Sequence, residues 1–199
     1  MAERRSRRRE RPGTGGDGEG DRPHRDLRAK DDPPRPEASG GKAVTARSGD
    51  WRTEAAELRA KRPRHILFLC VANSARSQMA EGIARSLAPQ EVTVSSAGSS
   101  PSSVRPQAIR VLNEIGIDIS GHRSKGLESI DTGSVDAVIT LCAEEVCPVF
   151  LGKAHRVHWG LPDPAGVTGT EETRLDAFRS VRDELRRRLK VLFGHGDER

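Results

Sequence analysis

Cys70 and Arg76 have the types and spacing expected of a nucleophile and an anion-binding partner. The run between them follows the apolar stretch 65–69 and precedes an amphipathic segment that begins near Ser77. A strand, a short loop and a helix in this order predict a pocket for a tetrahedral oxyanion, which the loop amides and the positive end of the helix dipole face. Arg76 supplies a planar fork that matches two oxygens of such an anion. The same field stabilises a thiolate, so we expect Cys70 to be the nucleophile. The predicted oxyanion-binding residues are Val71, Ala72, Asn73, Ser74, Ala75 and Arg76.

Residues 77–87 support this interpretation. Ser77 is placed to hydrogen-bond the Cys70 sulfur, and Met79, Ile83 and Leu87 share one stripe of the predicted helix. The less favoured alternative is a buried cysteine at the end of a strand with a surface arginine nearby, because free cysteines are commonly core residues.

Two further polar residues follow predicted strands. Cys142 comes after the apolar run 135–141, and Asp163 follows the short strand 156–159. Because parallel strands of an open sheet end at one edge, we expect Cys70, Cys142 and Asp163 to converge there. An Asp-Pro pair is also a common turn, so a purely structural role is the alternative for Asp163.

Alternating elements predict the fold class. The expected strands are 65–69, 91–96, 135–141 and 156–159, and the expected helices are 77–87, 105–115 and 171–193. This order predicts an α/β domain with a small four-stranded parallel sheet flanked by helices.

Composition divides the chain of 199 residues in two. Residues 1–60 are rich in Arg, Asp, Glu, Pro and Gly and predict a disordered, charged tail, whereas 61–199 predict one folded domain. The net charge is +5, with a local basic excess at 4–9. We favour a solvated tail, or a start assigned too far upstream, over a nucleic-acid contact. Because no apolar core follows these arginines and no run could span a bilayer, we expect a cytoplasmic protein without membrane contact. We also expect a monomer.

Three motifs together resemble the thioredoxin-coupled arsenate reductases, which share the fold of the low-molecular-weight protein tyrosine phosphatases. They are the run 70–82, the cysteine pair in 141–148, and the sequence His-Trp-Gly-Leu-Pro-Asp-Pro-Ala at 158–165. The resemblance covers about residues 65–193. It implies arsenic detoxification, with arsenate as the substrate and thioredoxin as the external reductant.

The resemblance also implies a role for each site residue. Cys70 would attack arsenate, Arg76 and the loop amides would hold its oxygens, Ser77 would favour the thiolate, and Asp163 would protonate the departing oxygen. Cys142 would then attack Cys70 and release arsenite, and Cys147 would attack Cys142 to move the disulfide outward.

The spacing of Cys142 and Cys147 carries its own consequence. If the segment were helical, the two Cα atoms would be roughly 8 to 9 Å apart, which is beyond the reach of a disulfide. Oxidation would therefore require residues 143–146 to unwind or loop out. The alternative is two buried thiols that never meet.

Other candidate residues receive structural roles. A thiolate stabilised by the loop needs no base, so we interpret His122 and His158 as structural. No His/Cys cluster has zinc-ligand spacing, so we expect neither a metal nor a bound cofactor. Some members of the resembled family bind potassium through positions that correspond to Asn73, Glu81, Ser96 and a carboxylate. Lys125 stands at the carboxylate position and could pair with Glu81, although it could equally be a surface lysine.

Two competing functions stay open. A phosphotyrosine or small-phosphoester phosphatase would use Cys70, Arg76 and Asp163 with water as the second nucleophile. Its pocket walls are commonly aromatic, whereas Asp163-Pro164 is followed here by Ala165-Gly166 and the chain contains no Tyr. A non-catalytic oxyanion or redox sensor is the less favoured third option, because the chain keeps a nucleophile, an acid and two further thiols.

Overall fold

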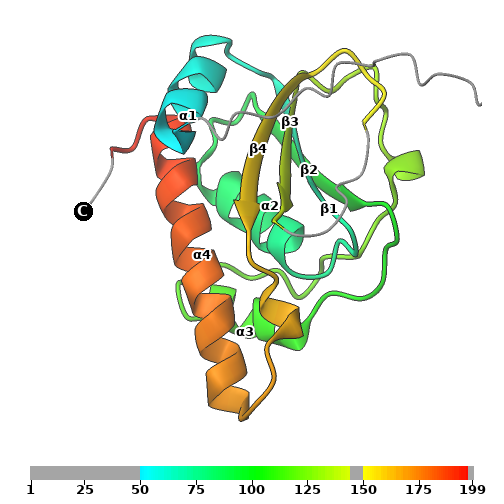
Figure 1. Cartoon of the computed structure of the whole chain (residues 1–199). Helices are drawn as coiled ribbons and strands as arrows, with labels where there is room; N and C mark the ends of the chain where they lie inside the picture. The colour runs from blue at the N-terminus through cyan, green and yellow to red at the C-terminus, as the bar shows by residue number, and fades with distance from the viewer. Residues whose placement is uncertain (1–49, 144–149, 197–199) are drawn as a thin grey trace, which may run out of the picture. The chain divides into compact units, whose positions relative to one another are not determined.

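The computed structural model describes residues 50–143 and 150–196 (Figure 1). Four parallel strands form one sheet in the order β2-β1-β3-β4. The strands are β1 His65–Cys70, β2 Thr93–Gly98, β3 Ala137–Cys142 and β4 His155–Leu161. The α-helices are α1 Trp51–Ala60, α2 Arg76–Leu87, α3 Pro106–Asn113 and α4 Glu171–Phe193. The predicted fold class, a small four-stranded parallel sheet with flanking helices, is confirmed.

Strand register places the functional ends together. β1 lies between β2 and β3, with Cys70 opposite Gly98 and Leu69 opposite Thr140. Because all three strands run in the same direction, their carboxyl ends share one edge, as the alternating pattern predicted. β2 begins and ends two residues later than expected, and β4 extends further on both sides. Both differences are shifts at element ends, where local signals are weakest.

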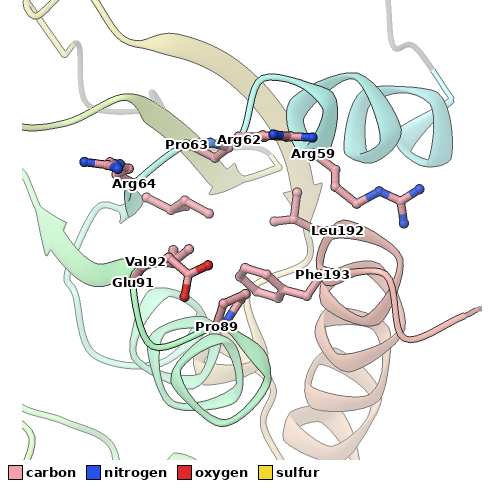
Figure 2. Close-up of a pocket in the computed structure, with 10 residues that line it drawn as sticks. Arg59, Arg62, Pro63, Arg64, Pro89, Glu91, Val92, Leu192 and Phe193 are labelled. Atoms are coloured by element: carbon pink, nitrogen blue, oxygen red, sulfur yellow. The ribbon is translucent and has the colours of Figure 1, made fainter.

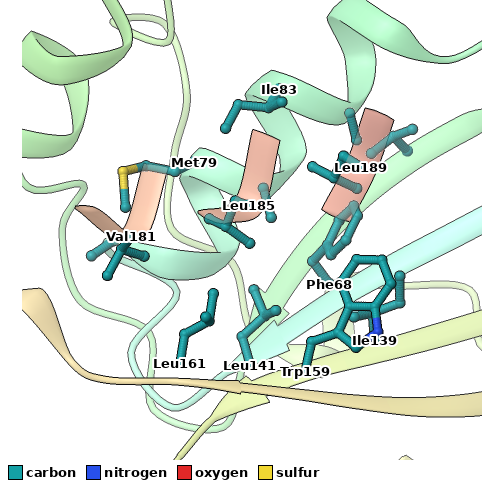
Figure 3. Close-up of a cluster of buried hydrophobic side chains, with 14 of the residues drawn as sticks. Phe68, Met79, Ile83, Ile139, Leu141, Trp159, Leu161, Val181, Leu185 and Leu189 are labelled. Atoms are coloured by element: carbon teal, nitrogen blue, oxygen red, sulfur yellow. The ribbon is translucent and has the colours of Figure 1, made fainter. Parts of the chain in front are cut away.

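The main core lies on one face of the sheet. Alternate side chains of β1, β3 and β4, such as Phe68, Ile139 and Trp159, point to the face that all four α-helices cover. Figure 3 shows these side chains meeting Ile83 of α2 and Leu189 of α4. A smaller cluster on the opposite face contains Leu67, Leu69, Ala97, Val135, Val138 and Phe150. Helix α2 is thus fixed between β1 and α4, which sets the position of the loop at its start.

Helix α1 corrects the predicted domain boundary. Residues 51–60 were expected to belong to the disordered tail, but they form a helix whose Ala55 and Leu58 are completely buried. The Asp50 side chain caps it by accepting from the Arg52 amide, and Arg187 of α4 lies over the Trp51 ring at 4.9 Å. The prediction failed because only Ala55 and Leu58 of this helix are buried, and charged residues stand between and around them.

The remaining tail prediction, residues 1–49, lies outside the described residues. Within the described ranges, no helix is both long enough and apolar enough to cross a bilayer.

Candidate active site

The loop after β1 is held by its outward carbonyl groups. Val71 O accepts from the Ser100 amide at 2.9 Å, Ala72 O from the Ser102 amide at 3.0 Å, and Ser74 O from the Arg105 amide at 2.9 Å. Because these carbonyls are tied to the segment after β2, the loop amides are left to face the interior of the loop. This arrangement is an anion-binding concavity made by the backbone.

Gly98 allows β2 to approach this loop. A Cβ atom at Gly98 would lie 2.4 Å from Val71 O and 2.8 Å from the Asn73 amide nitrogen. Side chains of any size are therefore excluded where the end of β2 supports the loop. The sequence carried a signal for this contact, since glycine at a strand end often marks a close backbone approach.

Asn73 holds the turn at the centre of the loop. Its φ of 45° lies in the left-handed region, which asparagine tolerates better than most residues. The side chain is completely buried, and its Oδ1 accepts from the Lys125 amide at 2.7 Å and from Gln78 Nε2 at 2.8 Å. These bonds over-determine the strained turn and so hold it in place.

A directed hydrogen-bond chain reaches the Cys70 sulfur. Asn73 Nδ2 donates to Ser77 Oγ at 2.9 Å, and Ser77 Oγ lies 2.9 Å from Cys70 Sγ. Because the Ser77 oxygen accepts from Asn73, its own hydrogen is free to point at the sulfur. The Ser77 hydroxyl is thus placed to donate a hydrogen bond to the Cys70 sulfur.

Arg76 and Asp163 form the opposite wall. Arg76 Nη1 donates to Leu161 O at 3.1 Å, and Nη2 pairs with Asp163 Oδ1 at 3.4 Å. Asp163 also accepts from the Ala165 amide at 3.3 Å, which orients its carboxylate after β4. Arg76 is nearly buried, whereas the Asp163 side chain is 42% exposed and open to a ligand.

The amino terminus of α2 carries the positive end of the helix dipole, and no side chain of the helix offsets it. Its N-cap residue, Ala75, has no side-chain hydrogen bond, and its first turn contains no acidic residue. The free amides and the helix dipole are therefore available to an anion in the loop. The resulting cavity has a volume of about 210 Å³ and is lined by Cys70, Val71, Ala72, Ser74, Ala75, Arg76, Arg105, Asp163 and Ala165.

Lys125 stands where some relatives of the resembled family have a carboxylate that binds potassium. Its Nζ lies 3.2 Å from Glu81 Oε2, which confirms the predicted pairing. Glu81 is 1% exposed and also pairs with Arg85 and accepts from Ser96 Oγ. Since Ser96 in turn accepts from Asn73 Nδ2 at 2.8 Å, the ammonium group of Lys125 is connected to the loop network.

Cys142 ends β3, the strand that lies beside β1. It is not among the residues that line the cavity around Cys70, so the predicted convergence on one site holds for Cys70 and Asp163 only. The β3–β4 ladder shifts register between Thr140 and Cys142, as at a β-bulge. Both cysteines are buried, and no disulfide joins them. Cys147, the third predicted thiol, lies outside the described residues.

The two histidines contact other groups. His122 Nδ1 donates to Gln78 Oε1 at 3.0 Å, and burial lowers the pKa of His122 below its usual value of 6.5. His158 Nδ1 lies 2.8 Å from Thr140 Oγ1 on β3. Neither lines the cavity around Cys70, so their predicted structural roles stand as predictions. Among the residues that the structure describes, no group of three His, Cys, Asp or Glu side chains is arranged to hold a metal ion.

A second cavity, of about 330 Å³, lies near the amino end of β1 (Figure 2). Its floor is apolar and includes Val92, Leu192 and Phe193. In Figure 2 the guanidinium groups of Arg59 and Arg64 point in opposite directions from it. Arg62 and Glu91 line it as well, but it contains no cysteine, unlike the cavity around Cys70.

The supporting segment 100–105 was missed by sequence reasoning. It contributes the backbone donors that orient the loop, and Arg105 adds a side chain to the cavity wall. Its residues carry no motif, because their function rests on main-chain groups that every residue possesses.

Comparison with known proteins agrees with this geometry. The fold and the loop define a phosphatase-type α/β domain, and residues 65–198 match the family model described as low molecular weight phosphotyrosine protein phosphatase. The chain belongs to this family.

Its relatives include proteins named arsenate reductase. The one from Halalkalibacterium halodurans is 45% identical over 128 residues, covering 63% of this chain and 92% of its own. The one from Bacillus subtilis is 44% identical over 127 residues, covering 63% and 91%. A solved structure described as an arsenate reductase in the phosphate binding state is 36% identical, with a TM-score of 0.56, and covers 66% of this chain and 98% of its own.

Proposed function

We propose that this protein reduces arsenate to arsenite by a thiol relay, with thioredoxin as the external reductant. The observation that carries the proposal is the second thiol, Cys142, at the end of the strand beside the Cys70 loop. A phosphate-type pocket alone would serve hydrolysis, but a neighbouring thiol offers the two electrons that reduction needs. The names of relatives at 45% and 44% identity support the same assignment.

The first step is a substitution at arsenic. The loop amides and Arg76 hold arsenate oxygens, and the Cys70 thiolate forms a sulfur–arsenic bond. One oxygen leaves as water after Asp163 supplies a proton. The charge on the sulfur is favoured beforehand by the Ser77 hydroxyl at 2.9 Å.

The second step transfers the electrons. Cys142, as a thiolate, attacks Cys70 Sγ, and the electron pair of the sulfur–arsenic bond leaves with arsenic as arsenite. The two sulfurs lose two electrons and form the Cys70–Cys142 disulfide. Because Cys142 does not line the cavity around Cys70, the end of β3 must move for this attack.

The last steps restore the thiols. Cys147 attacks Cys142 and releases the Cys70 thiolate, and the dithiol of thioredoxin reduces the Cys142–Cys147 disulfide. This scheme uses no bound cofactor, and it belongs in the cytoplasm, where thiols are kept reduced.

Phosphoester hydrolysis is a second candidate, because the family model carries that activity in its description. Water would replace Cys142 as the second nucleophile, and Asp163 would act as acid and then base. The wall residue after Asp163-Pro164 is Ala165, so the cavity offers no aromatic stacking partner for an aryl group among its lining residues.

One experiment separates the two activities. Arsenate-dependent NADPH oxidation is followed with thioredoxin and thioredoxin reductase, and hydrolysis of p-nitrophenyl phosphate is followed in parallel. Cys142→Ser and Cys147→Ser should each abolish the coupled turnover and spare hydrolysis, whereas Cys70→Ser should abolish both. Ester hydrolysis without any arsenite from the intact protein would favour the phosphatase.

A further inference from the structure

Arg105 belongs to the oxyanion cavity by both its backbone and its side chain. Its amide donates to Ser74 O at 2.9 Å, which ties its Cα to the loop around Cys70. Arg105 also lines the cavity around Cys70, as Asp163 does. The Arg105 guanidinium makes no hydrogen bond or ion pair within the part of the chain that the structure describes.

The position of Arg105 contradicts the usual preference for a helix start. It is the N-cap of α3, with φ −70° and ψ 131°, and its side chain caps nothing. Asn, Asp, Ser or Thr at such a position would bond a free amide, and a cation there also opposes the helix dipole. An arginine that weakens its own helix and lines a cavity is expected to act in ligand binding at that cavity.

The charges that line the cavity leave room for a second cation beside Arg76. Arg76 is already paired with Asp163 at 3.4 Å and bonded to Leu161 O, so its charge is partly offset before any ligand enters. A further positive group near the outer oxygens of a doubly charged oxyanion would add to the loop amides and the helix dipole. Arg105 is exposed at the cavity wall and is free to turn toward them.

We propose that Arg105 is a second oxyanion-recognition residue, selective for small doubly charged oxyanions of the phosphate and arsenate type. This inference deepens the proposed function and rests on its cavity, though not on its redox steps.

The test is calorimetric titration of the reduced full-length protein with inorganic phosphate. Arg105→Asn should weaken phosphate binding about 3- to 10-fold, the range for one charge acting on a dianion through a hydrated cavity. Arg105→Lys should recover part of the loss. Arg110→Asn is the matched control, because Arg110 is exposed on the same helix and does not line the cavity.

A second readout separates recognition from structure. Because Asn can cap α3, Arg105→Asn should raise the melting temperature while it weakens phosphate binding. In steady-state assays it should raise KM and leave kcat nearly unchanged.

The proposal is overturned if Arg105→Asn binds phosphate as tightly as the parent protein. It is also overturned if Arg110→Asn loses affinity equally, or if affinity and melting temperature fall together. Phosphate binding needs no turnover, so a failure of arsenate reduction would not affect this result.

Discussion

The contact between Gly98 and the loop is the most sensitive steric feature of the site. In Gly98→Ala the new methyl group would lie 2.4 Å from Val71 O and 2.8 Å from the Asn73 nitrogen. Both partners are backbone atoms, so the loop must move by about 1 Å to reach an ordinary contact. Crowding of this kind costs about 1–3 kcal/mol of stability. A displacement of about 1 Å at the reacting groups costs about 100-fold in rate.

The assay for Gly98→Ala is kcat/KM for arsenate reduction and, in parallel, for p-nitrophenyl phosphate hydrolysis. Both should fall about 100-fold, because both depend on the same loop, while circular dichroism shows a folded protein. Gly121→Ala is the control, since a Cβ there meets nothing within 4 Å. If Gly98→Ala kept kcat/KM within a factor of two of the parent, the loop would not be held as we describe.

Three further predictions concern the charges around the loop and helix α4. Ser77→Ala removes the hydrogen-bond donor that lies 2.9 Å from the Cys70 sulfur. It should lower kcat about 10- to 100-fold, which is the value of a hydrogen bond to a charged group, and should leave phosphate binding intact. An unchanged kcat would show that Ser77 does not assist the sulfur. Because Lys125 pairs with Glu81 at 3.2 Å, activity at constant ionic strength should be equal in potassium and sodium, and strong potassium stimulation would refute this role of Lys125. Hydrogen bonds from Arg179 above all, and also from Arg182, lower the pKa of Glu114 from 4.5 to about 2. The stability that Glu114 contributes should therefore be complete above about pH 4.5 and fall toward pH 2, and denaturant titrations of Glu114→Gln should lack this part of the acid dependence.

The fold was largely predictable because its signals are local. The buried strand 65–69 and the helix at 171–193 have long, regular apolar patterns, and α4 was predicted with its observed bounds. Helix α1 gave too little apolar pattern to be recognised, since only Ala55 and Leu58 are buried. Its stability comes from packing on α4, which is distant in sequence.

The candidate site was predictable where side chains carry the chemistry. Cys70, Arg76 and Asp163 line one cavity, as the positions of their strands indicated. Cys142 was expected to converge with them but does not line this cavity, and the register shift in the β3–β4 ladder beside it leaves no mark in an apolar pattern. The supporting carbonyl bonds from 100–105 were not predictable either, since any sequence supplies those amides.

In the proposed relay, two sulfurs of this chain supply the electrons that reduce arsenic. The most direct test uses Cys147→Ser, in which the relay should stop after its first disulfide. A single turnover with arsenate, followed by acid quenching and peptide mass spectrometry, should reveal a Cys70–Cys142 disulfide together with one arsenite per disulfide formed. Arsenite release with Cys142 remaining a free thiol, or no arsenite at all, would contradict the account.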